Sequence, residues 1–320
     1  MTISGILTEG KKLLAAPCPE ASIDTPSLDA ALLLAEVLRT NREALIVRGN
    51  ESINESDREK FLKLLERRRS GECAAYILGR KEFRGLSFTV SRNVLVPRPD
   101  TETLAEIALE YIDSMAGQRT SPGNISLLDL CTGSGALAVS LKNERPFLNV
   151  SASDISEEAL EIAEENAARL VGTAPLQGNT KHSGSPIKFI HSDLFENIRG
   201  KFSIIVSNPP YIPSGELASL TPEVKAEPAI ALDGGGDGLD LIRKIIGRAT
   251  EYLQPAEKFP GREFPGGVLL LEAAPEQMRA IAVLLEKRGF GNIKIHRDLA
   301  GKDRVISAIS RPGDLNSASD

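Results

Sequence analysis

The first 75 residues carry hydrophobic positions at helical spacing. Leu28 and Leu32, and then Leu33 and Val37, are each four positions apart, so each pair would lie on one face of a helix. Asn54 precedes a charged, amphipathic run and is expected to cap the helix that follows, because its side-chain oxygen can accept a backbone N–H bond. The pattern predicts a small helical domain over residues 1–75.

The hydrophobic period changes after this domain. In residues 76–99, hydrophobic and polar positions alternate with a period closer to two, as in EFRGLSFTV, which is typical of β-strands. Gly85 and Asn93 are the candidates for turns. The segment is predicted to be a β-hairpin that links two domains.

Residues 100–311 alternate short apolar runs, rich in β-branched residues, with amphipathic helical segments. This alternation is typical of a mostly parallel sheet covered by helices on both faces. The predicted strands lie at 126–131, 149–154, 187–193, 202–208 and 266–273. Two last runs, 292–298 and 303–310, are separated by only LAGK, which is too short for a parallel crossover, so they are expected to pair antiparallel. The prediction is an α/β domain whose sheet ends in an antiparallel hairpin.

Three polar segments rich in Gly and Pro interrupt this pattern, near residues 117–124, 171–186 and 254–266. We expect irregular insertions there. Residues 312–320 have little to bury and are predicted to form a flexible tail.

Composition and charge narrow the class of protein. The chain has 320 residues, 38 Lys and Arg against 44 Asp and Glu, and 41% hydrophobic residues, which suits a folded protein of two domains. The net charge of −6 argues against a protein that wraps long duplex nucleic acid. Cys18, Cys73 and Cys131 form no pair motif, which argues against a disulfide framework or a zinc site and for a reducing compartment. No apolar stretch has the length of a membrane span or a signal peptide, so a cytoplasmic protein is expected.

A glycine-containing loop lies between a predicted strand and a predicted helix. It consists of Cys131, Thr132, Gly133, Ser134 and Gly135. A backbone without Cβ atoms can approach a ligand closely there. Three interpretations are open: a dinucleotide-binding fingerprint, the looser loop of an S-adenosylmethionine site, and a tight turn that binds nothing. An alanine occupies the third position of the dinucleotide fingerprint, so the spacing favours the S-adenosylmethionine loop over the dinucleotide site.

Two acidic residues follow the next two strands. Asp154 ends its strand about 20 residues beyond the glycine loop, where nucleotide-binding α/β folds place an acid on the ribose hydroxyls. The alternative is that Asp154 caps the next helix, but Ser156 is better placed for that and would leave Asp154 free for a ligand. Asp193 ends the third strand and is the candidate for the adenine side, with Leu194 beside the ring.

The tetrapeptide Asn208, Pro209, Pro210 and Tyr211 follows the fourth predicted strand directly. Consecutive prolines keep the backbone extended, so their carbonyl groups stay available instead of joining a sheet. The Asn208 side-chain oxygen and the Pro209 carbonyl can each accept a bond from a planar NH₂ group, with Tyr211 packed on its plane. The arrangement suits a side-chain amide or the exocyclic amine of a base, and a rigid turn without a ligand is the remaining alternative.

Three segments, in this order, resemble the motifs of class I S-adenosylmethionine-dependent methyltransferases: DLCTGSG, SASD and SNPPY. Four further segments are similar to the release factor glutamine methyltransferase family (HemK/PrmC), so the resemblance covers nearly the whole chain. They are AYILGRKEF (75–83), FTVSRNVLVPRPDTE (88–102), EVKAEPAIALDGGGDGLD (223–240) and RDLAGKDR (297–304). NPPY alone leaves DNA adenine, ribosomal RNA and protein glutamine methyltransferases open, and the VPRPDTE segment selects among them.

The resemblance implies a Rossmann-like, seven-stranded catalytic domain, a hairpin linker, and an N-terminal helical bundle that helps to dock the substrate. Residues 131–135 and Asp154 would bind S-adenosylmethionine, with Leu194 and Asn208 alongside. The wall over the cofactor would include three residues of the VPRPDTE segment: Arg98, Pro99 and Thr101.

The resemblance also implies the substrate, which is the glutamine of the GGQ loop in class I peptide chain release factors. The segment from Asn208 to Tyr211 would hold its amide, and a monomer that needs no metal, membrane or nucleic acid is expected. Three residues depart from the family pattern. Cys131 stands where the loop usually has glycine, Leu194 where an aromatic residue is common, and Cys73 where proline is common.

The expected chemistry follows from the amide group. An amide nitrogen is a poor nucleophile because its lone pair is delocalised into the carbonyl. Acceptors at Asn208 and Pro209 that localise this pair would promote in-line transfer from a sulfonium without a strong general base. His182, His191 and His296 are therefore expected to be structural.

Three other functions stay open at this point. The first is methylation of a ribosomal protein glutamine, and the second is methylation of an exocyclic base amine. A DNA enzyme is disfavoured, since neither a target-recognition domain nor a basic groove is evident in the sequence. The third is a binding module for translation factors that keeps the fold without the activity.

Overall fold

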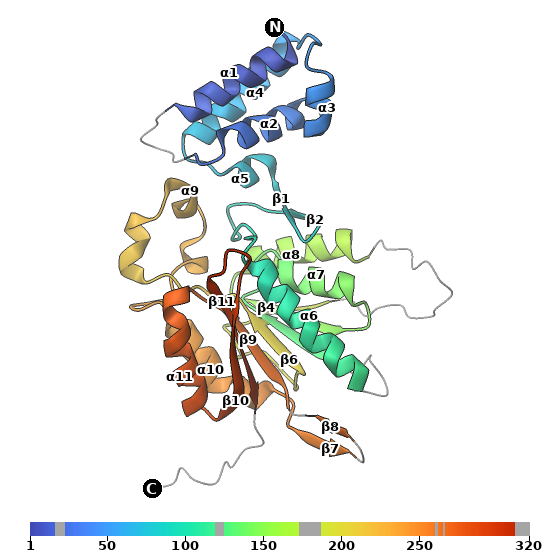
Figure 1. Cartoon of the computed structure of the whole chain (residues 1–320), viewed down its shortest axis with the longest axis vertical. Helices are drawn as coiled ribbons and strands as arrows, with labels where there is room; N and C mark the ends of the chain where they lie inside the picture. The colour runs from blue at the N-terminus through green and yellow to red at the C-terminus, as the bar shows by residue number, and fades with distance from the viewer. Residues whose placement is uncertain (17–22, 119–124, 173–186, 260–261, 265, 311–320) are drawn as a thin grey trace, which may run out of the picture.

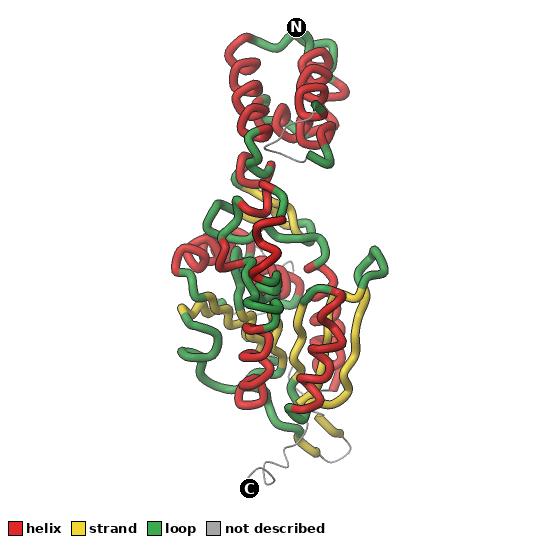
Figure 2. The backbone as a smooth tube through the Cα atoms, turned by 90° about the vertical axis from the view of Figure 1, so that its left-hand side faces the viewer, coloured by secondary structure: helices red, strands yellow, loops and turns green. Residues whose placement is uncertain are grey.

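The computed structural model describes residues 1–16, 23–118, 125–172, 187–259, 262–264 and 266–310. Figure 1 shows an elongated molecule, with a helical part at its N-terminal end and a larger part in which helices cover both faces of a sheet. The view in Figure 2, turned by 90°, shows the same separation of the helical part from the layered part.

The N-terminal helices are α1 (Ile3–Ala15), α2 (Pro26–Val37), α3 (Arg42–Val47), α4 (Glu55–Arg69) and α5 (Ala74–Leu78). Leu33 and Phe61 belong to the buried cluster that these helices share. Asn54 caps α4 as predicted, because its Oδ1 accepts the Asp57 N–H at 2.8 Å. The boundary predicted at residue 75 falls inside α5, so the division between domains stays a prediction.

A small hairpin follows α5. Strands β1 (Arg80–Phe83) and β2 (Leu86–Thr89) pair antiparallel. They are joined by Arg84 and Gly85, which both have positive φ, 49° and 71°, as a two-residue turn of type I′ requires. The predicted turn at Asn93 is also present, since the Val94 N–H donates to the Ser91 carbonyl at 3.2 Å.

The large sheet has the strand order β10-β11-β9-β6-β3-β4-β5. Its strands are β3 (Ser126–Leu130), β4 (Asn149–Asp154), β5 (Lys188–His191), β6 (Ile204–Ser207), β9 (Val268–Glu272), β10 (Phe290–Arg297) and β11 (Asp303–Ser310). Neighbouring strands from β9 to β5 are parallel, and β11 pairs antiparallel with β9 and β10. The prediction of a seven-stranded sheet that ends in an antiparallel hairpin is confirmed.

Helices cover both faces of this sheet (Figure 1). They are α6 (Thr101–Gln118), α7 (Ala136–Glu144) and α8 (Glu157–Leu170) on one face, and α10 (Asp240–Tyr252) and α11 (Met278–Lys287) on the other. Leu127 of β3 packs in the cluster with α6 and α7, whereas Leu128 packs in the cluster with α10 and α11. Both faces of the strand are therefore buried in apolar clusters, and Asp129 is the charged residue within it.

One predicted insertion has regular structure. Strands β7 (Glu257–Phe259) and β8 (Arg262–Phe264) pair antiparallel, so the prediction of an irregular segment over 254–266 is wrong there. The available signal was the Pro-Gly pair, a dipeptide typical of turns, with the similar tripeptides EKF and REF on its two sides. The other two predicted insertions lie largely outside the described residues, as does the predicted tail.

A buried ion cluster ties the helical part to the segment that follows NPPY. This segment contains η2 (Ser214–Ser219), α9 (Pro222–Lys225) and η3 (Ala229–Ala231), and η4 (Pro275–Gln277) follows β9. Arg68 of α4 donates from Nε to Asp29 Oδ2 at 2.7 Å and from Nη1 to Glu223 Oε1 at 2.6 Å. Because Arg68 is only 5% exposed, this contact holds α9 against α2 and α4.

None of the helices within the described ranges is both long and apolar enough to cross a lipid bilayer. In the same ranges, no group of three or more His, Cys, Asp or Glu side chains is arranged to hold a metal ion. A cytoplasmic location stays a prediction.

Candidate active site

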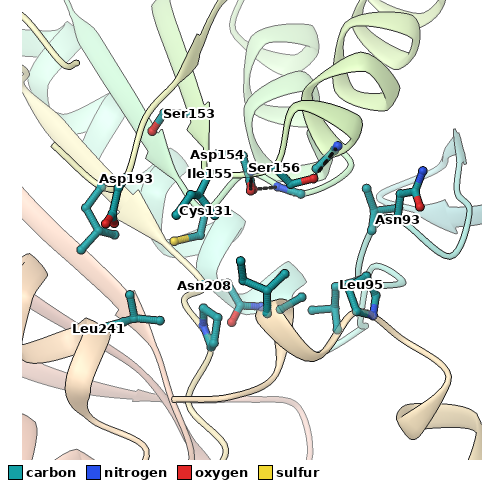
Figure 3. Close-up of a pocket in the computed structure, with 18 of the residues that line it drawn as sticks. Asn93, Leu95, Cys131, Ser153, Asp154, Ile155, Ser156, Asp193, Asn208 and Leu241 are labelled. Carbon is teal, nitrogen blue, oxygen red and sulfur yellow. Dashed lines mark hydrogen bonds between the residues drawn. The ribbon is translucent and has the colours of Figure 1, made fainter. Parts of the chain in front are cut away.

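A pocket lies at the carboxyl ends of β3, β4 and β6, where ligands bind in open α/β sheets. Figure 3 shows Asp154 and Ser156 across the pocket from Asn208, with Asp193 toward one end and Asn93 toward the other. The predicted site residues that line it are Cys131, Gly133, Asp154, Asp193, Leu194, Asn208 and Pro210. Residues at the ends of four strands, β3, β4, β5 and β6, therefore contribute to one cavity.

The loop after β3 is built from left-handed backbone. Cys131, Gly133 and Gly135 have φ of 59°, 55° and 78°, a region that favours glycine because a side chain is strained there. A Cβ on Gly135 would also come within 3.1 Å of Ala163. Cys131 thus carries a side chain at a position that suits glycine, and burial raises the pKa of its thiol far above the usual value.

Asp129, which lies in β3 just before this loop, stabilises the loop by hydrogen bonds, a role that the sequence analysis did not assign. Its Oδ2 accepts the Thr132 hydroxyl at 2.6 Å and the Ala138 N–H at 3.2 Å, while Oδ1 is buried with no partner in the described residues. The carboxyl group joins the loop to the first turn of α7, and burial raises its pKa to about 7. A polar residue at a buried strand position was the signal available in the sequence.

The raised pKa of Asp129 predicts a pH dependence of stability. In the unfolded chain the carboxyl titrates near its ordinary value of 3.8, and in the folded chain near 7. The folded state therefore binds this proton more tightly, and the stabilisation is complete below pH 3.8 and is lost as the pH rises through 7. Urea unfolding at a series of pH values should give a free energy of unfolding that falls over this range, by at most roughly 1.4 kcal/mol per pH unit from this group. Asp129→Asn should lack this contribution, and an unchanged slope in the variant would contradict the assignment.

Asp154 is less free than its sequence position indicated. Ser156 caps α8 as predicted, since its Oγ accepts the Ala159 N–H at 3.1 Å. Even so, Asp154 Oδ1 accepts the Ser156 N–H at 3.0 Å and Oδ2 accepts the Gly133 N–H at 2.8 Å. The loop and the start of the helix both turn N–H groups toward this strand end, so Asp154 has two backbone partners, and its role in binding a ligand stays a prediction. Each carboxylate oxygen still has a lone pair for a ligand hydroxyl.

Removing the charge of Asp154 should weaken cofactor binding. Asp154→Asn is expected to raise the dissociation constant of S-adenosylmethionine about 10- to 100-fold, because charge-assisted hydrogen bonds contribute about 1.5–3 kcal/mol. Isothermal titration calorimetry measures this. Glu157→Gln is the matched control, since it removes an exposed carboxylate three residues further along, at the start of α8 and outside the pocket lining. Equal increases of the dissociation constant in the two variants would mean that Asp154 acts only through long-range electrostatics and not through hydrogen bonds to the cofactor.

The far end of the pocket is formed by the turn after β5. Leu194 has a φ of 46°, and its carbonyl accepts the Ser192 hydroxyl at 2.9 Å, which holds the turn closed. Asp193 and Leu194 both line the cavity, together with Leu241 from α10. An apolar wall beside a carboxylate suits a planar ring with an amino group, as the sequence analysis expected for the adenine side.

The NPPY segment turns away from the sheet at the pocket edge. Asn208 Nδ2 donates to Thr101 Oγ1 at 3.1 Å, and Asn208 and Pro210 line the cavity. The Tyr211 carbonyl accepts the Gln277 amide at 2.9 Å, and a Cβ on Gly238 would come within 2.2 Å of that carbonyl. The Gly238 backbone therefore packs directly against the Tyr211 carbonyl, and together with Gln277 it fixes the backbone of NPPY. Burial raises the pKa of Tyr211 to about 12, so its phenol is neutral.

Several predicted residues lie outside the lining of the cavity. Thr132, Ser134, Gly135, Pro209 and Tyr211 belong to the same loops but do not line it, and neither do Arg98, Pro99 and Thr101. The wall that we expected from Arg98, Pro99 and Thr101 is formed instead by residues 93–95. Arg98 points to Glu227, whose carboxylate accepts a hydrogen bond from Arg98 Nη2 at 2.5 Å and another from the Val96 N–H at 3.2 Å. This contact joins the wall to the pocket rim that follows Glu227.

The sequence analysis assigned no site role to that rim. Pro228, Ile230 and Ala231 line the pocket, and Ile230 is 57% exposed. The conspicuous signal was the EVKAEPAIALD segment, which was used for the resemblance but not placed in space. An exposed apolar residue at the mouth of a pocket is suited to contact a bound partner.

The chemistry of the lining fits S-adenosylmethionine better than a dinucleotide. Among the described residues, the lining contains two carboxylates, Asp154 and Asp193, and no Lys, Arg or His. Such a lining favours a cation with hydroxyl groups over a pyrophosphate. Ser153 Oγ, at the same pocket, is buried without a partner in the described residues.

Comparisons with known proteins agree with this geometry. The family model described as PrmC N-terminal domain matches residues 6–79, and the one described as Methyltransferase small domain matches residues 118–239. The release factor glutamine methyltransferase of Deinococcus radiodurans is 35% identical over 308 residues, which cover 96% of this chain and 98% of that protein. That of Neisseria gonorrhoeae is 40% identical over 283 residues and covers 88% and 92%.

A solved structure supports the fold alone. The crystal structure of the hMettl16 catalytic domain in complex with MAT2A 3′UTR hairpin 6 has a TM-score of 0.53 and 14% sequence identity. The similarity covers 77% of this chain and 82% of that one. The sheet and its helical layers are therefore shared with that catalytic domain.

Proposed function

The chain belongs to the release factor glutamine methyltransferase family, and we propose that it methylates the side-chain amide nitrogen of the GGQ glutamine in class I peptide chain release factors, with S-adenosylmethionine as methyl donor. The observation that carries the proposal is the position of Asn208, which lines the same cavity as Asp154 and Asp193. An acceptor for an amide group thus lies in the cavity that fits the donor.

The residues divide into those that hold the cofactor and those that hold the amide. Asp154 would accept the ribose hydroxyls, and Asp193 and Leu194 would border the adenine. When bound, S-adenosylmethionine supplies a methyl group on a positively charged sulfur, and the two carboxylates favour that charge. The loop from Cys131 to Gly135 lets the backbone approach the cofactor closely.

Asn208 and Pro209 would prepare the substrate nitrogen. The Asn208 Oδ1 and the Pro209 carbonyl each accept one N–H of the amide, which favours a nitrogen whose lone pair is localised and whose charge becomes positive during transfer. Pro209 and Pro210 have no N–H and a fixed φ, so these acceptors are held before the substrate arrives. A neutral Tyr211 is suited to pack on the amide plane.

Proton transfer to a strong base is not required for the methyl transfer itself. The methylated amide nitrogen becomes acidic, and it can lose its proton to water once the acceptors release it. His191 lies at the end of β5, where its Nε2 contacts the Ile155 carbonyl at 2.9 Å, and His296 contacts the Ser307 hydroxyl at 2.8 Å. Both contacts suit structural roles.

We further propose that the enzyme acts as a cytoplasmic monomer, without a metal or nucleic acid, and that residues 1–75 help to dock the release factor. The docking role is supported by the match of residues 6–79 to the family model described as PrmC N-terminal domain.

A panel of acceptors tests the function. The purified chain and S-adenosylmethionine are incubated with a class I release factor, a set of ribosomal proteins, and DNA and RNA oligonucleotides, and the intact mass of each is measured. We expect one added methyl group on the release factor alone. A methyl group on a ribosomal protein or an oligonucleotide instead would show that the proposed substrate is wrong. No transfer to any acceptor would favour a binding module.

A further inference from the structure

Glu272 ends β9, and its carboxylate is buried beside the candidate active site. The residue is 1% exposed, and neither carboxylate oxygen has a full hydrogen bond within the described part of the chain. Ser207 of β6 pairs with Leu271 in a parallel register, so Glu272 lies next to Asn208. A buried carboxylate without hydrogen bonds costs free energy, and its position beside Asn208 points to the reason for its presence.

Two polar side chains lie near enough to Glu272 to favour its charged form. Burial raises the pKa of Glu272 to about 7, and the nearby Thr101 hydroxyl and Asn208 amide oppose that shift. Arg304 of β11 also favours the carboxylate, but it is shared with Asp100, whose Oδ2 lies 3.0 Å from Arg304 Nη2. The carboxylate is therefore left to interact with the hydroxyl and the amide.

The direction of the Asn208–Thr101 hydrogen bond depends on what the Thr101 hydroxyl does with its own proton. Asn208 Nδ2 donates to Thr101 Oγ1 at 3.1 Å, which leaves the hydroxyl proton for another acceptor. An ionised carboxylate only accepts, so Glu272 attracts the hydroxyl proton and the second N–H of the Asn208 amide. Both interactions favour the orientation of the Asn208 amide in which Nδ2 faces Thr101 and Glu272 and Oδ1 faces the pocket.

We propose that Glu272 is a positioning residue for methyl transfer, which acts with Thr101 to hold the Asn208 amide so that Oδ1 faces the substrate. The inference rests on the proposed function, because Oδ1 is the acceptor that we assign to the substrate amide. An Asn208 amide turned around would present its own N–H groups to the N–H groups of the substrate, which repel each other. Loss of the carboxylate populates both orientations.

A double-mutant cycle with Glu272→Gln and Asn208→Ala tests this role. Glutamine keeps the shape of the side chain but adds a donor, so it can hold the Asn208 amide in either orientation. We expect Glu272→Gln to lower kcat on the release factor about 10-fold or more, with KM for S-adenosylmethionine and the unfolding midpoint not impaired. In the Asn208→Ala background, the same change should alter kcat by less than about twofold, since no amide remains to be oriented.

Thr101 supplies a second, independent pair of variants. Thr101→Val removes the hydroxyl at nearly constant shape and should lower kcat as Glu272→Gln does, whereas Thr101→Ser keeps the hydroxyl and should restore kcat to near the wild-type value. Independent, multiplying effects of Glu272→Gln and Asn208→Ala, or equal losses in Thr101→Ser and Thr101→Val, would overturn the positioning role alone. A wild-type enzyme that transfers no methyl group to the release factor would overturn the proposed function and this role together.

Discussion

Asn208→Ala is expected to lower the turnover number for methylation of the release factor about 100- to 1000-fold, the loss typical of removing one preorganised group that stabilises a transition state. The variant removes the side-chain oxygen that accepts from the substrate amide, so the amide lone pair stays delocalised. The affinity for S-adenosylmethionine should change far less, because Asp154 and Asp193 still line the pocket. Single-turnover kinetics with saturating cofactor, together with calorimetric titration of the cofactor, measure the two quantities.

Asn197→Ala is the matched control for this prediction. It removes an amide of the same type near the end of β5, where Asn197 Nδ2 donates to the His191 carbonyl at 2.9 Å outside the pocket lining. Its turnover number should stay near the wild-type value. If Asn208→Ala reduces turnover and cofactor affinity by equal factors, Asn208 is a cofactor ligand and not the amide acceptor.

Arg68→Met is expected to reduce the free energy of unfolding by about 3–5 kcal/mol, the usual cost of breaking a buried charge network by removing one member. Asp29 and Glu223 would both lose their cationic partner, and Asp29 would stay almost fully buried. Because the cluster joins α2 and α4 to α9, the loss should also loosen the helical part from the pocket rim. Urea unfolding followed by circular dichroism measures the change.

Arg67→Met serves as the control for charge and helix propensity on the same helix. Arg67 pairs with Glu72 at 2.8 Å, but its side chain is 46% exposed, so the loss should stay below about 1 kcal/mol. Similar losses in the two variants would show that the buried cluster adds nothing beyond a surface ion pair.

The sheet and the acid at the end of β4 could be predicted from the sequence for a physical reason. Strands covered on both faces are mostly apolar, and β3 and β9 are hydrophobic apart from Asp129 within β3 and the terminal residues Ser126 and Glu272. Asp154 could be predicted from its place at the end of the next strand, about 20 residues beyond the glycine loop. The short connection LAGK between the last two runs excludes a parallel crossover, which predicted the direction of the last hairpin.

The parts of the site that could not be predicted depend on contacts between distant segments. Arg98 pairs with Glu227, 129 positions away, and this pair turns Arg98 away from the pocket while residues 93–95 form the wall. Glu272 closes an apolar strand and carries no motif of its own. Its place beside Asn208 follows only from the register between β6 and β9.

The most direct test of the account is to locate the methyl group in the reaction product. A class I release factor is incubated with S-adenosylmethionine and either the wild-type enzyme or Asn208→Ala, and the GGQ peptide is fragmented by tandem mass spectrometry. The account predicts one methyl group on the side-chain amide nitrogen of the GGQ glutamine with the wild-type enzyme, and almost none over the same time with the variant. A methyl group on another residue, or equal methylation by the two enzymes, would contradict it.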